Sequence, residues 1–142
     1  MVAELSADLG VRRGDFALDI ELQIGAGEVV ALLGPNGAGK STALRVLAGL
    51  LRLTSGHIAI GGSLVADAVS GIHRAPHERP IGVVFQDYLL FPHLTVLDNV
   101  AFGPLVRGLE KREARQRAAV WLSRVGIADL ANAKPRSVSG GQ

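Results

Sequence analysis

Cysteine is absent from the 142 residues of this chain, and aromatic residues make up only 4% of it. Without cysteine the chain has no disulfide, no thiol nucleophile and no cysteine-based metal site. No apolar run approaches the ~20 residues that a membrane-spanning helix requires. The first residues lack the basic-then-apolar order of a secretion signal. We therefore expect a soluble chain that reaches a membrane only through a partner.

Charge is nearly balanced, since 15 Lys and Arg face 13 Asp and Glu, a formal net charge of +2. Domains that bind nucleic acid usually carry a strong, clustered basic face, so we expect no nucleic-acid partner. Apolar residues reach 48% and charged residues 20%, which is typical of a soluble globular domain with a packed core. Glycine is plentiful at 18 residues, which indicates many positions with positive φ or close approach to a ligand.

Hydrophobic periodicity predicts strands in the first half of the chain. Apolar and polar residues alternate over Phe16–Ile24, the pattern of a strand with one buried face. Val29–Leu33 and Ile81–Gln86 are short apolar runs, typical of strands buried on both faces. Residues 56–65 are a further small strand region. Val69–Pro80 contains glycine and two prolines and is predicted to be a loop.

Three helices are predicted, over Ser41–Leu51, within Leu94–Gly103 and over Glu110–Val125. Gly126 is a suitable residue to end the last of them. The apolar faces expected to be buried are Leu44, Leu47, Ala48 and Leu51 in the first helix, and Ala114, Ala118, Trp121, Leu122 and Val125 in the last.

The strongest motif is the run Gly34-Pro35-Asn36-Gly37-Ala38-Gly39-Lys40-Ser41, which fits G-x-x-x-x-G-K-[ST] between an apolar run and a helix. Glycines let successive backbone N–H groups turn toward an anion, and the following helix presents the positive end of its dipole. Lys40 would add a charge at the β- and γ-phosphates, and Ser41 a hydroxyl for Mg²⁺. Together with Thr42, these residues are the predicted phosphate site for ATP, with Mg²⁺ as the second cofactor.

A phosphate loop alone does not distinguish kinases, GTPases and transport ATPases, but the motifs around it do. Val138-Ser139-Gly140-Gly141-Gln142 resembles the LSGGQ signature of ATP-binding-cassette (ABC) proteins, and Val83–Gln86 resembles the end of their Q-loop strand. Glu28 resembles the acidic residue that precedes their phosphate loop. The motifs stand in the family's order and at about its spacing, so the chain resembles an ABC protein from about residue 9 to 142.

The resemblance implies an α/β fold of the P-loop NTPase class. It implies a partial ABC nucleotide-binding domain that consists of an N-terminal β-subdomain, a phosphate-loop core and a helical subdomain. Within residues 1–142, the β-subdomain and core would occupy about 1–87 and the helical subdomain about 88–138. The signature would occupy 138–142.

The resemblance also implies roles for single residues. Gln86 would reach Mg²⁺ together with Ser41. Phe16, the one aromatic residue upstream of the phosphate loop, is a candidate for stacking on adenine, and its place in an alternating strand equally suits a core residue. A second copy of the chain would bind head to tail, so that each signature contacts the partner's ATP through Ser139, Gly140, Gly141 and Gln142.

Residues 82–103 are similar to importer ATPases of the molybdate and sulfate group. This similarity implies an ATP-hydrolysing subunit that lies as a peripheral protein on the cytoplasmic face of the cell membrane. It also implies that molybdate is the cargo. Its partners would be transmembrane permease subunits and, indirectly, an extracytoplasmic solute-binding protein. Tyr88, Phe91 and Leu94 are candidate permease contacts, and each equally suits packing within the helical subdomain. Importers of sulfate, iron or polyamines are alternatives.

ABC proteins continue beyond the signature with the Walker B strand, a catalytic Glu and a switch His. No strand-like apolar run in this sequence ends in an Asp-Glu pair. We therefore expect no catalytic residue within 1–142 and an inactive fragment, and a non-catalytic nucleotide-binding fragment is an alternative. Repair and chromosome-cohesion ATPases are disfavoured, because they insert a long coiled coil where this chain has one long helix between Gln86 and Ser139.

Overall fold

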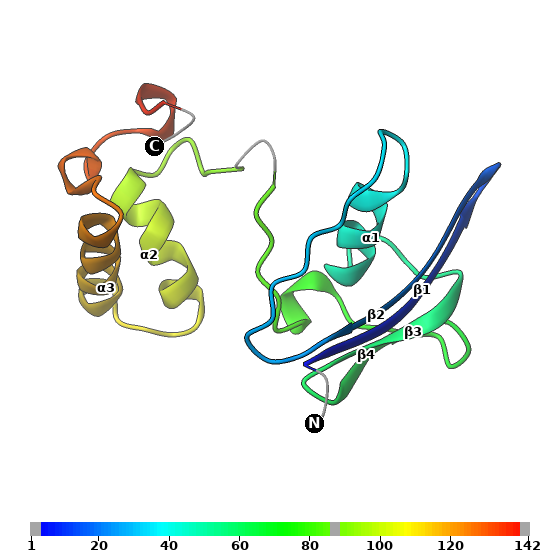
Figure 1. Cartoon of the computed structure of the whole chain (residues 1–142). Coiled ribbons are helices and arrows are strands. Elements are labelled where there is room, and N and C mark those ends of the chain that lie inside the picture. Colours follow the sequence, from blue (N-terminus) through cyan, green and yellow to red (C-terminus); the bar gives the residue numbers. More distant parts are fainter. Residues whose placement is uncertain (1–3, 86–88, 140–142) are drawn as a thin grey trace. The chain divides into compact units, whose positions relative to one another are not determined.

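The computed structural model describes residues 4–85 and 89–139. The chain divides into two compact units, Met1–Val83 and Val84–Gln142. In the described residues the first unit holds a sheet and one α-helix, and the second holds two α-helices (Figure 1). None of the helices in the described part of the chain is long and apolar enough to cross a membrane.

A five-stranded antiparallel sheet organises the first unit, with strand order β2-β1-β3-β4-β5. β1 and β2 form a long hairpin whose tight turn contains Gly14, with φ of 54°, and pairs Arg13 with Phe16. β1, β3 and β4 each lie between two partner strands, whereas β2 and β5 are the edges of the sheet. The strands are β1 Leu5–Arg13, β2 Phe16–Ile24, β3 Ser55–Ile60, β4 Ser63–Asp67 and β5 Ile72–His73.

The core of the first unit lies between one face of this sheet and helix α1, Lys40–Leu47. The alternation predicted for Phe16–Ile24 is confirmed. Every second residue of β2, from Phe16 to Ile24, is buried or half-buried, and the residues between them are exposed. The strand residues at the centre of the core are Ala7, Leu9 and Val11 on β1, Leu18 on β2, Ile58 and Ile60 on β3, and Val65 and Ala66 on β4.

Helix α1 begins close to the predicted residue, but it ends before the predicted end. Of the residues expected to be buried, Ala48 is buried, and Leu47 and Leu51 are half-buried against the core. Ala43 and Val46, three residues apart, face the sheet and are fully buried. Leu44 was expected to be buried and is 54% exposed, so that prediction was wrong. A helix of two turns that packs on a single sheet face buries only a narrow stripe, and Leu44 lies outside it.

Two predicted strands are not strands in the structure. Val29–Leu33 and residues 81–85 have no regular structure, and Val29, Leu33 and Val84 are at least 90% exposed. The prediction of buried strands was wrong for both segments. An apolar run becomes a buried strand only where neighbouring strands satisfy its N–H and C=O groups, and the described strands pair with one another in the antiparallel sheet. Gln86 lies outside the described residues.

The second unit is built on two helices, α2 Val96–Val106 and α3 Lys111–Arg124. Both predicted helices are present, but α2 continues to Val106, beyond the predicted segment that ended at Gly103. Thr95 caps α2, since its hydroxyl accepts from the Asp98 N–H at 3.1 Å. Short turns of 3₁₀-helix elsewhere in the chain span Pro76–Glu78, Ala128–Leu130 and Pro135–Ser137. The small side chains at the centre of the helix pair are Ala101, Ala114 and Ala118.

The face of α3 that packs is narrower than predicted. Trp121 and Val125 were expected to be buried and are 57% and 63% exposed. The Arg124 guanidinium lies 4.9 Å from the centroid of the Trp121 ring, so the ring takes part in a cation–π contact at the surface. Leu122 is buried as predicted. Gly126 follows the helix with φ of 77°, as expected for its C-terminal glycine.

Two glycines with positive φ provide a test of the sheet. Gly56 on β3 has φ of 86°, and a Cβ there would overlap the backbone carbonyl of Asp8 on β1. Gly62, in the turn after β3, has φ of 75° and open space around it. We expect Gly56→Ala to lower the free energy of unfolding by about 3 kcal/mol or more and Gly62→Ala by about 1 kcal/mol. Urea unfolding measures both, and equal losses would contradict the close approach of β3 to β1.

Candidate functional site

The glycine-rich loop turns directly into helix α1. Gly37 and Gly39 have φ of 85° and 95°, which only glycine adopts readily, and the Ala38 N–H donates to the Pro35 carbonyl at 3.3 Å. Gly39 is the N-cap of α1, and no side chain accepts a hydrogen bond there. The first turn also carries no acidic residue. The free N–H groups and positive end of α1 are thus left for an external anion.

Lys40 places its charge over the same loop. Its ammonium donates to the carbonyls of Gly34 and Pro35, each at 2.8 Å. An ammonium has three N–H donors, so one donor remains for a further acceptor. Ser41 and Thr42 follow in the first turn of α1, and Ser41 is exposed. The structure therefore brings the predicted phosphate-binding residues together in one loop and helix start.

Two side chains of β2 support the end of this loop. A Cβ at Gly39 would lie 2.7 Å from Leu18 Cδ1 and 3.1 Å from Phe16 Cζ. Gly39 is therefore required both for its φ and for the space it leaves. Phe16 is half-buried and packs against the core of the first unit, beside the phosphate loop. Its stacking on adenine stays a prediction.

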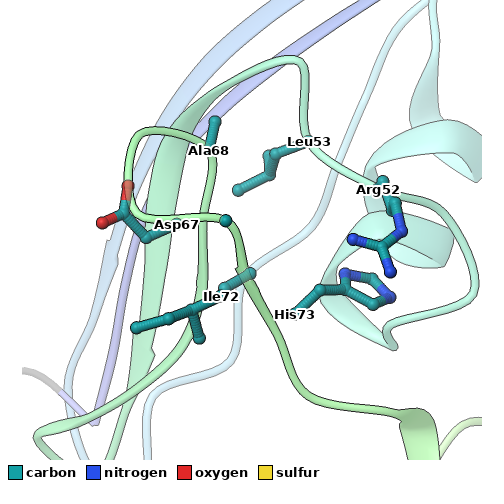
Figure 2. Close-up of a pocket in the computed structure, with 8 residues that line it drawn as sticks. Arg52, Leu53, Asp67, Ala68, Ile72 and His73 are labelled. Atoms are coloured by element: carbon teal, nitrogen blue, oxygen red, sulfur yellow. The ribbon is translucent and has the colours of Figure 1, made fainter.

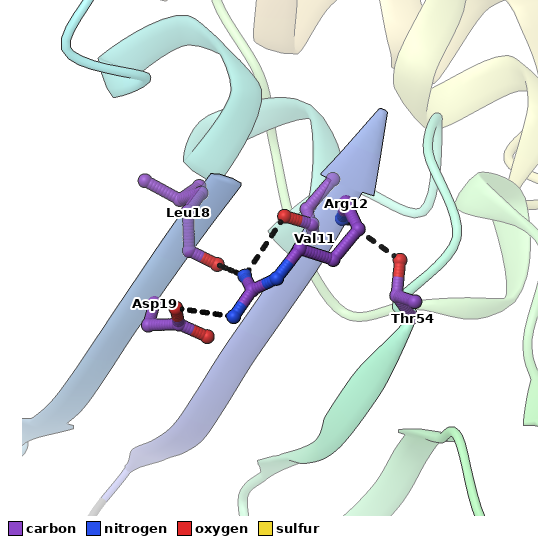
Figure 3. Close-up of polar contacts among 5 residues, drawn as sticks. All are labelled: Val11, Arg12, Leu18, Asp19 and Thr54. Carbon is purple, nitrogen blue, oxygen red and sulfur yellow. Dashed lines mark hydrogen bonds and ion pairs between the residues drawn. The ribbon is translucent and has the colours of Figure 1, made fainter. Parts of the chain in front are cut away.

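Arg12 links the hairpin to the segment before β3 (Figure 3). Its guanidinium donates to the Asp19 carboxylate at 2.7 Å and to the carbonyls of Val11 and Leu18 at 3.3 and 3.4 Å. Its backbone N–H donates to the Thr54 hydroxyl at 3.0 Å. The hydrogen bond that Arg12 donates to Asp19, followed by the negative charge of Asp19, raises the pKa of Arg12. The ion pair is exposed and adds little stability, so its effect is to fix the end of the hairpin that carries Leu18.

The signature and Q-loop predictions fall mostly outside the described residues, where Gln86, Tyr88, Gly140, Gly141 and Gln142 lie. Ser139 is described and exposed, and it follows the short 3₁₀ turn Pro135–Ser137 of the second unit. Its role in contacting a nucleotide therefore stays a prediction.

The candidate permease contact Phe91 lies on an ordered surface of the second unit. Its ring is 4.5 Å from that of Phe102 and 6.0 Å from that of His93, and both phenylalanines are about 40% exposed. Asn99 holds the Phe91 backbone by accepting from its N–H at 2.8 Å and donating to its carbonyl at 3.1 Å. Leu94 is half-buried. Sequence reasoning missed Phe102 and Asn99, although both stand in the segment predicted to contain a helix, shortly after Phe91.

A small pocket of about 90 Å³ lies in the first unit (Figure 2). Arg52 and His73 line one side of it, and the pKa of His73 is lowered by burial and then by the charges of Arg52 and Arg79. Asp67 lines the other side of the pocket, and the hydrogen bond that the Ser70 hydroxyl donates is the main cause that lowers its pKa. In the residues that the structure describes, no group of three or more potential ligands could hold a metal ion.

The sequence of this chain matches a known protein family. The sequence profile of the family described as ABC transporter matches residues 17–142. The chain belongs to the ABC transporter family. It is 49% identical over 132 residues to the molybdenum import ATP-binding protein ModC of Mycobacterium tuberculosis. This match covers 90% of this chain and 36% of that protein.

Other members of the ABC transporter family are nearly as similar to the chain. The trehalose/maltose import ATP-binding protein MalK of Thermococcus litoralis is 45% identical over 124 residues. The Fe(3+) ions import ATP-binding protein FbpC of Rhizobium etli is 48% identical over 124 residues. Each of these matches covers 87% of this chain and 33% of the relative. The chain thus spans about a third of the length of the curated relatives that it matches.

Solved ABC structures share the fold. The chain matches cbiO1 of Clostridium perfringens, part of the ABC transporter complex cbiONQ, with a TM-score of 0.78 and 31% identity, over 100% of this chain and 58% of that one. It also matches the ATP-binding cassette MJ0796, in a dimeric post-hydrolysis state bound to ADP and Pi, with a TM-score of 0.73 and 27% identity. This match covers 97% of this chain and 64% of that one. The predicted fold class, a partial ABC nucleotide-binding domain of the P-loop NTPase class, is confirmed.

The lowered pKa of His73 gives a pH prediction. A histidine whose folded-state pKa lies below 6.5 makes the protein less stable as the pH falls from about 6.5 through that lower pKa, because the unfolded chain binds the proton first. We expect Arg52→Gln to raise the pKa of His73 and to reduce this loss, since it removes a neighbouring cation. Proton NMR titration of the imidazole measures the pKa. Arg45→Gln, on the exposed side of α1, is the control, and an unshifted pKa in Arg52→Gln would contradict the assignment.

Proposed function

We propose that the chain is part of the ATP-binding subunit of an ABC importer, which couples binding and hydrolysis of ATP to solute uptake. The observation that carries the proposal is the start of α1, where a helix with no capping side chain follows a loop that is spanned by the Lys40 ammonium. Membership in the ABC transporter family and its importer relatives support the same function.

The residues of this loop fit a nucleoside triphosphate. The N–H groups of the loop and of the first turn of α1 would bind the phosphates, and Lys40 would turn its free donor to the β- and γ-phosphates. Ser41 and Gln86 would hold Mg²⁺, which neutralises charge on the phosphates when bound. Phe16 would stack on adenine. Hydrolysis, on this proposal, needs a catalytic glutamate that residues 1–142 do not supply.

The arrangement of partners follows from the same proposal. Residues of about 1–87 would form the β-subdomain and phosphate-loop core, and residues of about 88–138 the helical subdomain. Ser139 and the residues after it would bind ATP held by a second copy of the subunit, in a head-to-tail dimer. The subunit would lie at the cytoplasmic face of the membrane, bound to its permease subunits, with Phe91 among the contacts. An extracytoplasmic solute-binding protein would deliver the solute to the permease.

Molybdate is the proposed cargo, and iron is the second candidate. ModC of Mycobacterium tuberculosis supports molybdate at 49% identity, and FbpC of Rhizobium etli supports iron at 48%. The two values are too close to separate the cargoes, because the phosphate site is common to importers of different solutes. Uptake measurements must therefore decide between them.

The phosphate-loop assignment is tested by Lys40→Ala. We expect this change to weaken Mg-ATP binding at least about a hundredfold, since it removes a full positive charge from the site that would hold the phosphates. Isothermal titration calorimetry of the protein measures the affinity. Arg45→Ala removes a cation from the exposed side of the same helix and should bind as the wild type does. An unchanged affinity in Lys40→Ala would remove the basis of the proposed function.

The cargo is tested by deleting the gene and measuring uptake of labelled molybdate, sulfate and Fe(3+). We expect molybdate uptake to be lost and the other two to be retained, with restoration by the wild-type gene and not by Lys40→Ala. Loss of Fe(3+) or sulfate uptake with molybdate uptake intact would reject molybdate and leave the ATPase assignment in place.

A further inference from the structure

Arg79 is the one charged side chain that is buried in the described part of the chain, at 5% exposure. Its guanidinium makes no ion pair there. Nη1 donates to the carbonyls of Val46 and Leu47 at 2.9 and 2.8 Å, and Nε donates to the carbonyl of Arg74 at 2.9 Å. Nη2 lies 3.5 Å from Nδ1 of His73. A buried cation is thus held by neutral acceptors alone.

Two of these acceptors form the C-terminal end of α1. Val46 and Leu47 are its last residues, and the last carbonyls of a helix lack helical partners and carry the negative end of its dipole. The Val46 carbonyl also accepts from the Gly49 N–H at 3.0 Å. The Arg79 guanidinium adds a further donor there, supplies a donor to the Leu47 carbonyl and places an opposite charge at this end of the helix. Burial lowers the pKa of Arg79, but an arginine remains charged in proteins.

Gly49 makes room for this contact. It has φ of 79°, and a Cβ there would lie 2.6 Å from Nε of Arg79. The chain therefore turns sharply after α1 and leaves the space that the guanidinium fills. Three acceptors in different directions suit the planar fork of arginine, and one lysine ammonium at the end of a flexible stem does not replace it.

The opposite end of the same helix is the phosphate loop. α1 has eight residues, so about 12 Å of rigid helix separates the Arg79 contact from Lys40. Val46 and Ala43 fix the side of the helix that faces the sheet. Apolar packing of this kind lets a short helix slide or tilt, whereas directed hydrogen bonds at its end do not.

We infer that Arg79 is a positioning residue for nucleotide binding, which holds the C-terminal end of α1 and thereby aims the N–H groups and Lys40 at the other end. This inference rests on the proposed function of the phosphate loop. Arg79 acts through the helix and does not itself touch the nucleotide. It also places residues 81–85, since the Ile81 N–H donates to the Arg79 carbonyl at 2.8 Å and Ile81 packs against the core.

The test compares Arg79→Met with a variant of the same unit that loses stability outside the core against α1. Gly56→Ala, which disturbs the contact of β3 with the Asp8 carbonyl of β1, is the control. Affinity for Mg²⁺ and a non-hydrolysable ATP analogue is measured well below both unfolding temperatures, together with amide hydrogen exchange of residues 40–49. We expect Arg79→Met to weaken binding about tenfold and to speed exchange in residues 40–49. Gly56→Ala should bind as the wild type does, because a general loss of stability does not redirect α1. It should speed exchange throughout the first unit, and not chiefly in residues 40–49.

Arg79→Lys keeps the charge and loses the fork, so its affinity should fall between those of the wild type and Arg79→Met. If Arg79→Met does not fold, wild-type affinity in Arg79→Lys would overturn the inference, and weakened affinity would support it. Equal affinities for Arg79→Met and Gly56→Ala would also overturn it. If the wild type binds no nucleotide, the proposed function fails. Hydrogen exchange then tests the inference separately, since exchange in residues 40–49 of Arg79→Met that equals that of the wild type refutes the positioning of α1.

Discussion

The packing of α1 on the antiparallel sheet is the interaction on which the phosphate loop depends. Ala43 and Val46 bury the helix against the strands, and Leu18 and Phe16 of β2 fill the space that a side chain at Gly39 would need. Because the loop ends at this contact, its glycine is required by packing as well as by backbone conformation. The sheet therefore sets where the first N–H groups of α1 are presented.

Polar contacts restrain both ends of this short helix. Lys40 spans the loop at the N-terminal end through the carbonyls of Gly34 and Pro35, and Arg79 occupies the C-terminal end through those of Val46 and Leu47. Each cation thus bonds to backbone carbonyls, and neither forms an ion pair with a carboxylate of the described residues. Hydrogen bonds to charged donors are stronger than neutral ones, which suits a two-turn helix that has little stability of its own.

The second unit has a different construction, in which small side chains bring two helices together. Ala101, Ala114 and Ala118 leave the larger side chains Trp121 and Phe102 at the surface. Phe91 rests against Phe102 and is fixed by Asn99. An ordered aromatic surface of this kind suits contact with another protein, in keeping with the permease contact proposed for Phe91.

The sequence by itself determined the features that depend on neighbouring residues along the chain. The phosphate motif, the alternation of β2 and the helices α2 and α3 follow from local spacing, and ABC membership follows from motif order. Tertiary structure decided which apolar residues are buried. The hydrophobicity of a side chain does not by itself tell whether it is buried, as the exposed residues Val29, Leu33, Leu44 and Trp121 illustrate. Only the strands or helices beside a residue determine whether it is buried. The contact of Arg79 with α1 joins residues 32 and 33 positions apart, so no local pattern could reveal it.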